Sequence, residues 1–164
     1  MKSDQIQWLR DEMVNLELAA THLRFSLDRS RELIDRPVWS LEELERLESL
    51  TSRFARLADL LVQRVLRLID DLELSPRDSV LDRIQRAEKR GLFEESGQLM
   101  RIRELRNLIA HEYVSDQMPD IFRAVAALTP ALLAAIPKVK AHGDALILRY
   151  TRDDSSADSH DRID

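Results

Sequence analysis

The chain has 164 residues, of which 44% are hydrophobic and 34% are charged, which fits one globular domain and leaves no room for a second. It has no cysteine, so disulfides, thiolate metal ligands and a cysteine nucleophile are excluded. The formal net charge of -5 argues against tight, sequence-independent binding to duplex DNA.

The first two predicted elements are long helices, in a sequence where strong helix formers dominate and only 3 Gly and 5 Pro occur. Apolar residues recur at three- and four-residue intervals from Ile6 to about Ile34, which predicts an amphipathic helix, and Pro37 ends it. Ser40 then stands three residues before Glu43, as in a capping box, and the apolar pattern predicts a second helix to about Asp71. We expect these helices to form an antiparallel hairpin.

Two shorter helices are predicted next. Ser75 and Pro76 are typical of the N-cap and the first residue of a third helix, and Gly91 is its expected C-cap. A fourth helix is expected from about residue 94 or 95 through residue 109. Gly97 should slightly weaken its first turn.

The last predicted helix is the fifth, after a short connection over residues 115–119. It should run from Ile121 to Ile136, with an interruption or kink at Pro130. Residues 145–150 are apolar enough for one more helical turn or two. We therefore expect one helical domain over residues 1–150 and a disordered tail, rich in Ser and Asp, over residues 151–164.

The location expected from the sequence is the cytoplasm. The N-terminal residues lead straight into an amphipathic helix, and we find no apolar run that approaches the length of a membrane span or of a signal peptide. Contact with a membrane is accordingly not expected.

The densest group of chemically active side chains lies in residues 101–113, which carry three arginines, an asparagine, a histidine and a tyrosine. At about 100° per residue, Asn107 and His111 share one helix face, with Arg103 one turn before Asn107. The long side chain of Arg106 reaches across that face. The other side carries apolar residues that should face the bundle, namely Leu105, Leu108 and Ile109.

These side chains suffice for RNA cleavage without a metal or another cofactor. Histidine takes and returns a proton near neutral pH, and a guanidinium is a fixed cation that stabilises charge on a phosphate oxygen. The RNA supplies its own nucleophile, the ribose 2′-hydroxyl, so no Ser or Cys nucleophile is needed. We therefore predict His111 as the acid and base, Arg106 as the group that stabilises the phosphorane, and Asn107 as a positioning residue.

The motif residues resemble a known family. Arg106, four residues, His111, one residue and Tyr113 are similar to the Arg-x4-His-x-Tyr motif of the HEPN superfamily, and the stretch RNLIAHEY is especially similar to its HepT branch. Residues 88–92 resemble that branch's lead-in to the motif helix, and the helix order agrees over about residues 1–150. The resemblance implies an all-α antiparallel bundle of about five helices that forms a homodimer, with the two motif helices face to face and Arg106 and His111 from each chain in one cleft.

The resemblance also implies an activity and a partner. The activity is that of a metal-independent endoribonuclease toxin that cleaves mRNA or tRNA. The partner is an MNT-type nucleotidyltransferase antitoxin that adds AMP to Tyr113, which would put phosphate and a bulky nucleotide where the RNA phosphate must sit. The resemblance also implies that Asn107 orients His111 or contacts the RNA. A complex of toxin and antitoxin that is larger than a dimer is an open alternative.

Competing interpretations exist for the whole chain and for single residues. The alternatives for the whole chain are a non-catalytic HEPN partner, which binds a nucleotidyltransferase and presents a substrate or itself for modification, and a plain helical dimerisation module. His111 could be an ordinary surface histidine, and Tyr113 a packed aromatic at a helix end. Arg106 could simply pair with Asp70, Asp71 or a neighbouring Glu.

Other polar and aromatic residues receive structural interpretations. Arg101 and Arg103 are expected to be solvated or salt-bridged, with RNA phosphate binding as the alternative. His22, His142 and His160 have no partners at metal-ligand spacing, so no metal site is predicted, and His142 beside Gly143 is interpreted as a helix end. Trp8 and Trp39 are expected in the core or at a dimer interface.

Overall fold

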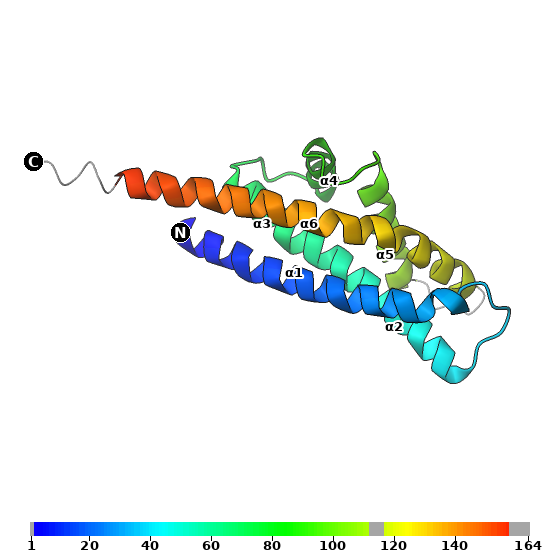
Figure 1. Cartoon of the computed structure of the whole chain (residues 1–164). Coiled ribbons are helices and arrows are strands. Elements are labelled where there is room, and N and C mark those ends of the chain that lie inside the picture. The colour runs from blue at the N-terminus through cyan, green and yellow to red at the C-terminus, as the bar shows by residue number, and fades with distance from the viewer. Residues whose placement is uncertain (1, 112–116, 158–164) are drawn as a thin grey trace, which may run out of the picture.

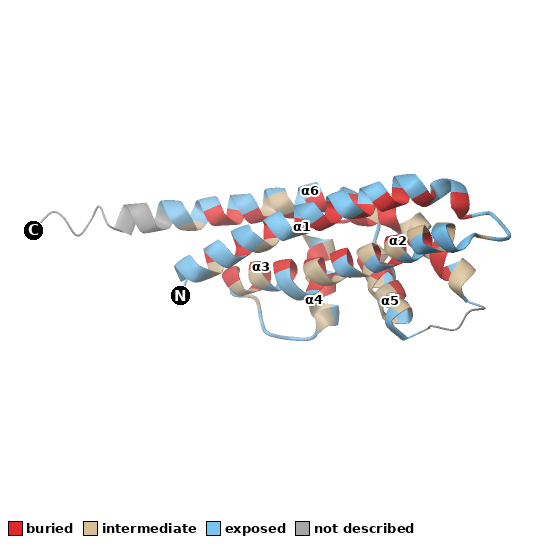
Figure 2. Cartoon of the chain, turned by 90° about the horizontal axis from the view of Figure 1, so that it is seen from below, coloured by how far each residue is buried: buried red, intermediate tan, exposed pale blue. Residues whose placement is uncertain are grey.

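The structure is a computed structural model that describes residues 2–111 and 117–157, with side chains through residue 152. Every element in these ranges is helical, which confirms the predicted all-α class. Three long rods lie side by side, formed by α1, by α2 with its extension, and by α6, and two short helices, α4 and α5, cross them (Figure 1). Buried residues line the inner faces of the long rods (Figure 2).

The predicted hairpin of the first two helices is present. Helix α1 (Lys2–Ser30) ends in a short 3-10 turn, η1 (Arg31–Leu33), and packs on α2 (Leu41–Asp59). Ser40 caps α2 as predicted: the backbone N–H of Glu43 donates to Ser40 Oγ at 3.2 Å, and the Ser40 N–H donates to Glu43 Oε2 at 3.0 Å. The rod continues through a π-helix, η2 (Leu60–Val65), into α3 (Leu66–Leu72).

Helix α4 (Val80–Lys89) begins later than the sequence predicts. Its N-cap is Ser79 and not Ser75, because the side chain of Asp82 completes a capping box with Ser79. The predicted C-cap at Gly91 is confirmed: its φ is 73°, and its N–H donates to the carbonyl of Glu88 while the N–H of Leu92 donates to that of Ala87. These two bonds form a Schellman motif.

Helix α5 (Gln98–His111) also begins later than predicted, and Gly97 lies just before it. The φ of Gly97 is 82°, a conformation that ends the preceding turn and is unsuited to a helix interior. Its N–H donates to Glu88 Oε1 at 2.8 Å, which ties the start of α5 to α4. Gly97 therefore sets where the motif helix starts, and the prediction that it weakens the first turn is wrong.

Helix α6 (Met118–Ala157) runs without a break through Pro130 and Pro137, where the sequence predicts a kink and an end. Each proline removes one backbone hydrogen bond, but the buried side chains beyond them, such as Leu132 and Val139, pack the helix onto the bundle. The helix also includes residues 151–157, which were predicted to be part of a disordered tail; residues 158–164 lie outside the described residues.

One single-residue expectation needs correction, and the expectation for Trp8 is narrowed to a dimer interface. His142 lies in the middle of α6 and not at a helix end, and its Nε2 atom is 2.6 Å from Glu73 Oε1. Trp8 is 57% exposed and so lies outside the core of the single chain. Trp39 is partly buried and donates to the carbonyl of Leu33 at 2.7 Å, as expected of a packed aromatic.

One stretch of α6, Met118–Arg152, is long and apolar enough to cross a membrane by length and composition. The sequence interpretation that no apolar run approaches this length is therefore wrong. Its most apolar window is 44% buried inside the bundle, and α6 packs against α1, α2 and α5. Core helices of compact proteins pass the same test, so the location of the protein stays a prediction.

An ionic network fixes α4 and α6 to α3. Asp70, only 5% exposed, accepts from Arg86 Nη2 at 2.8 Å and Arg90 Nη2 at 2.7 Å. Glu73 accepts from Arg90 at 2.5 Å and contacts His142. Burial raises the pKa of Glu73, but the hydrogen bonds from Arg90 and His142 outweigh burial and hold that pKa below its ordinary value.

Candidate functional site

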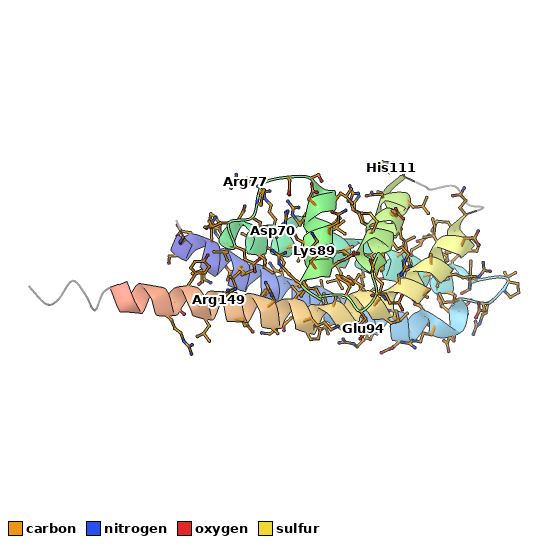
Figure 3. All side chains as sticks on the ribbon, turned by 90° about the horizontal axis from the view of Figure 1, so that it is seen from above. Asp70, Arg77, Lys89, Glu94, His111 and Arg149 are labelled. Carbon is orange, nitrogen blue, oxygen red and sulfur yellow. The ribbon has the colours of Figure 1, made fainter. Side chains whose placement is uncertain are left out.

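Helix α5 presents the predicted motif residues on its outer side. Leu99, Ile102 and Leu105 are buried against the bundle, as expected for the apolar side. Leu108 differs from the prediction, because it is 39% exposed. The helix crosses the long rods and carries His111 at its end, at the edge of the molecule (Figure 3).

Arg106 is held by a carboxylate from the neighbouring rod. Its Nε donates to Asp59 Oδ1 at 2.6 Å and its Nη2 to Asp59 Oδ2 at 2.8 Å, a two-pronged pair between α5 and the end of α2. These hydrogen bonds raise the pKa of Arg106 above its ordinary value, so it stays charged. The sequence interpretation offered Asp70 or Asp71 as partners and is wrong, because they bind Arg86, Arg90 and Arg77 instead.

The pair stands at the wall of a cavity of about 870 Å³ between α1, the α2–η2 rod and α5. Four arginines line it, and Asp59 is the one carboxylate among its described lining residues. Three amide side chains complete its polar lining. The polar residues are Arg56, Arg64, Arg103, Arg106, Asp59, Asn15, Gln63 and Asn107. The cavity is therefore strongly basic, although the whole chain is acidic.

The π-helix η2 follows Asp59 directly and supplies part of this lining. Its wider turn is evident in the N–H of Leu66, which donates to the carbonyl of Leu61, five residues earlier. Such a turn changes the direction of the side chains that follow it, and π-helical turns often occur at functional sites. Here it brings Gln63 and Arg64 to the cavity that contains Arg106.

The structure brings some of the predicted site residues together and leaves others apart. Asn107 and Arg103 line the basic cavity with Arg106. His111 is exposed and forms no hydrogen bond with another described side chain; it lies one turn beyond Asn107. Arg101 is exposed and pairs with Glu95 at 3.5 Å, as expected for a solvated ion pair. The predicted modification site, Tyr113, lies outside the described residues.

A second cavity of about 430 Å³ lies on the other side of Arg106. Its lining is more apolar and includes Ile109, Ala110 and Met118, with Thr51 on α2. Arg106 lines both cavities, so its side chain separates the basic cavity from the more apolar one.

The sequence interpretation missed Asp59, Arg56 and Arg64. Asp59 meets Arg106 across 47 residues of sequence, and no spacing rule connects two helices in this way. One local signal was available, because Asp59 is a lone acid between the apolar residues Ala58 and Leu60. A carboxylate in such a run usually has a partner.

Comparison with known proteins adds no family assignment. No protein-family description, curated protein sequence or solved structure matches this chain. Among the described residues, no three His, Cys, Asp or Glu side chains form a group that would hold a metal ion. The function must therefore be argued from the residues themselves.

Proposed function

We propose that the chain is a metal-independent endoribonuclease toxin of the HEPN type that cleaves mRNA or tRNA through the ribose 2′-hydroxyl. The observation that carries this proposal is the Arg106 guanidinium, which Asp59 holds at the wall of a basic cavity, on the same helix as Asn107 and His111. A fixed cation and a proton carrier on one helix are the groups that cleavage through the 2′-hydroxyl needs when no metal takes part.

Asp59 orients Arg106 without using all of its donors. A guanidinium has five N–H groups, and Asp59 accepts two of them, so five minus two leaves three for a phosphate. The carboxylate fixes the plane of the guanidinium and lowers the cost of ordering it when RNA binds.

The proposed chemical step uses two histidines, one His111 from each copy of the chain, to accept and to donate a proton. The neutral imidazole of His111 takes the proton of the 2′-hydroxyl as its oxygen attacks the adjacent phosphorus, and Arg106 stabilises the negative phosphorane oxygens. The bond from phosphorus to the 5′-oxygen then breaks, and the leaving oxygen takes a proton from the protonated His111 of a second copy. The products are a 2′,3′-cyclic phosphate and a free 5′-hydroxyl.

The exposed end of α5 supports the dimer that this step needs. Leu108 is 39% exposed and lies three residues before His111, so both side chains project from nearby parts of the helix surface. A second copy of α5 packed on this face would bury Leu108 and bring two histidines together. The partner that we propose for control is an MNT-type nucleotidyltransferase that adds AMP to Tyr113.

Cleavage of total RNA in EDTA tests the proposal. We expect the parent chain to cleave and His111→Ala and Arg106→Ala to be inactive, while the matched controls His22→Ala and Arg149→Ala keep full activity. Both control residues are exposed, and Arg149 lies far from His111 (Figure 3). Circular dichroism and sedimentation establish that each variant keeps the fold and the oligomeric state of the parent.

Two outcomes would change the conclusion. An inert parent chain, unmodified at Tyr113, would favour the non-catalytic partner of a nucleotidyltransferase. Cleavage by the parent that survives loss of His111 would place the proton carrier elsewhere. A mixture of the two inactive variants should stay inactive, because a mixed dimer has only one His111 and the proposed step uses one from each copy; regained activity would show that a single histidine serves as both base and acid.

A further inference from the structure

We propose that the basic cavity between α1, the α2–η2 rod and α5 is the groove that holds single-stranded RNA beside the scissile phosphate. In this groove Arg56 and Arg103 bind backbone phosphates, and Gln63 contacts base edges. The inference rests on the proposed function, because it assigns a place to the RNA that His111 would cleave. It adds residues that the motif does not contain.

The charge of the groove favours a polyanion. Arg106 is paired with Asp59, and Arg64 with Glu12 at 3.0 Å. Arg56 and Arg103 line the same cavity, and neither forms an ion pair with another residue in the described ranges. Two cations without a paired carboxylate therefore face one hollow, and a concave basic surface attracts phosphates more strongly than scattered arginines do.

The dimensions fit a strand that passes His111. Arg103 and His111 are eight residues apart on α5, which corresponds to about 12 Å along the helix axis. A strand whose reacting phosphate lies near His111 can therefore run along α5 past Asn107 and Arg106 to reach Arg103. Arg56 lies on the opposite rod, in α2, where it can bind a further phosphate of the strand. The cavity volume of about 870 Å³ lies within the range of pockets that enclose a ligand.

The remaining polar residues indicate how bases would be read. Gln63, Asn15 and Asn107 each offer both a donor and an acceptor to the cavity, whereas no aromatic side chain occurs among its described lining residues. Hydrogen bonding to base edges is therefore favoured over base stacking. Because base edges are free in single strands and paired in duplexes, the groove suits single-stranded RNA.

Binding and cleavage must be measured separately to test this groove. The binding probe is a fluorescent oligonucleotide that is 2′-O-methylated throughout, which cannot be cleaved through the 2′-hydroxyl. Its Kd for the full chain is measured in EDTA between 50 and 200 mM salt. The variants are Arg56→Gln, Arg103→Gln and their combination, with Arg149→Gln as the exposed control.

We expect each single variant to bind about tenfold more weakly, since a hydrogen bond to a charged group contributes roughly this factor. Because each phosphate contact on a single strand contributes about 0.7 to the steepness with which the logarithm of the binding constant falls with the logarithm of the salt concentration, the double variant should make this fall shallower by about 1.4. Arg149→Gln should match the parent. Equal affinity and slope in the parent and the double variant would overturn the groove.

The cleavage assay separates failure of the groove from failure of the proposed function. If the arginine variants bind as expected but the parent never cleaves RNA, the groove stands and the ribonuclease proposal falls. If the parent cleaves and the double variant binds and cleaves as well as the parent, the ribonuclease stands and the groove falls.

The base-reading role of Gln63 has its own measurement. Gln63→Ala should bring the Kd values for the four 2′-O-methyl homopolymers closer together and leave their salt slope unchanged, because an amide contact carries sequence information and no charge. Unchanged differences among the four homopolymers would overturn this part of the proposal.

Discussion

Replacing Arg106 with alanine should remove the activity and leave the fold nearly intact. In a dry interior, two charge-assisted hydrogen bonds would each contribute about 1.5 to 3 kcal/mol. The side chains of Arg106 and Asp59 are 34% and 42% exposed, so solvent screens the pair and lowers its contribution to the free energy of unfolding to about 1 kcal/mol. Asp59 keeps contact with water in the variant, so no charge is buried alone.

The same substitution should lower the rate of RNA cleavage by about 10² to 10³, the usual cost of losing one group that stabilises charge in the transition state. Urea unfolding of the parent, Arg106→Ala, Asp59→Asn and the double variant measures the stability effect. Because the two residues contact each other, the double-mutant cycle should give a coupling energy of about 1 kcal/mol.

Two results would refute this reasoning. A fall of more than about 3 kcal/mol for Arg106→Ala is the range of a broken buried ion pair, and it would make Arg106 a structural residue. A coupling energy of zero would show that the pair with Asp59 contributes nothing to stability, contrary to the value expected here. Cleavage at the parent rate by a folded Arg106→Ala variant would remove Arg106 from the chemistry.

Three further expectations follow from the fold. Ser79→Ala should lower the free energy of unfolding by about 1 kcal/mol, the value of a helix cap, whereas Ser75→Ala should have almost no effect in the same urea titration. Asp70→Asn should cost about 2 kcal/mol or more, because it removes the charge of a buried carboxylate that binds both Arg86 and Arg90, although Asp78 and Glu73 remain as their other partners. The control Asp28→Asn, in an exposed pair, should change stability by less than about 0.5 kcal/mol. The lowered pKa of Glu73 stabilises the fold at neutral pH and loses this effect as the pH falls through that pKa, so Glu73→Gln should flatten the acid side of a stability curve measured from pH 3 to 6.

The fold was predictable where local patterns decide it. The apolar spacing and the Ser40 capping box indicated the α1–α2 hairpin, and Gly91 indicated the end of α4. Prediction failed where tertiary packing outweighs a local signal. Pro130 and Pro137 do not end α6, because the helix is held along its length by burial against the other rods.

The candidate site was also predictable from the sequence only in part. The residues within one helix, Arg103, Arg106 and Asn107, were found from their spacing and do line one cavity. Asp59 and Arg56 were not found, because they reach the site through the packing of α2 against α5 and through no pattern along the chain. The role of His111 stays a prediction.

A defined RNA substrate tests the central claim most directly. After the preferred cleavage site has been mapped, the parent chain is given two oligonucleotides in EDTA that differ only in the 2′-hydroxyl of the nucleotide before the scissile bond. We expect the oligonucleotide with the hydroxyl to be cleaved to a 2′,3′-cyclic phosphate, and the 2′-deoxy oligonucleotide and the His111→Ala reaction to show no product. Equal cleavage of the two oligonucleotides, or no cleavage of either by the unmodified parent, would contradict the proposed function.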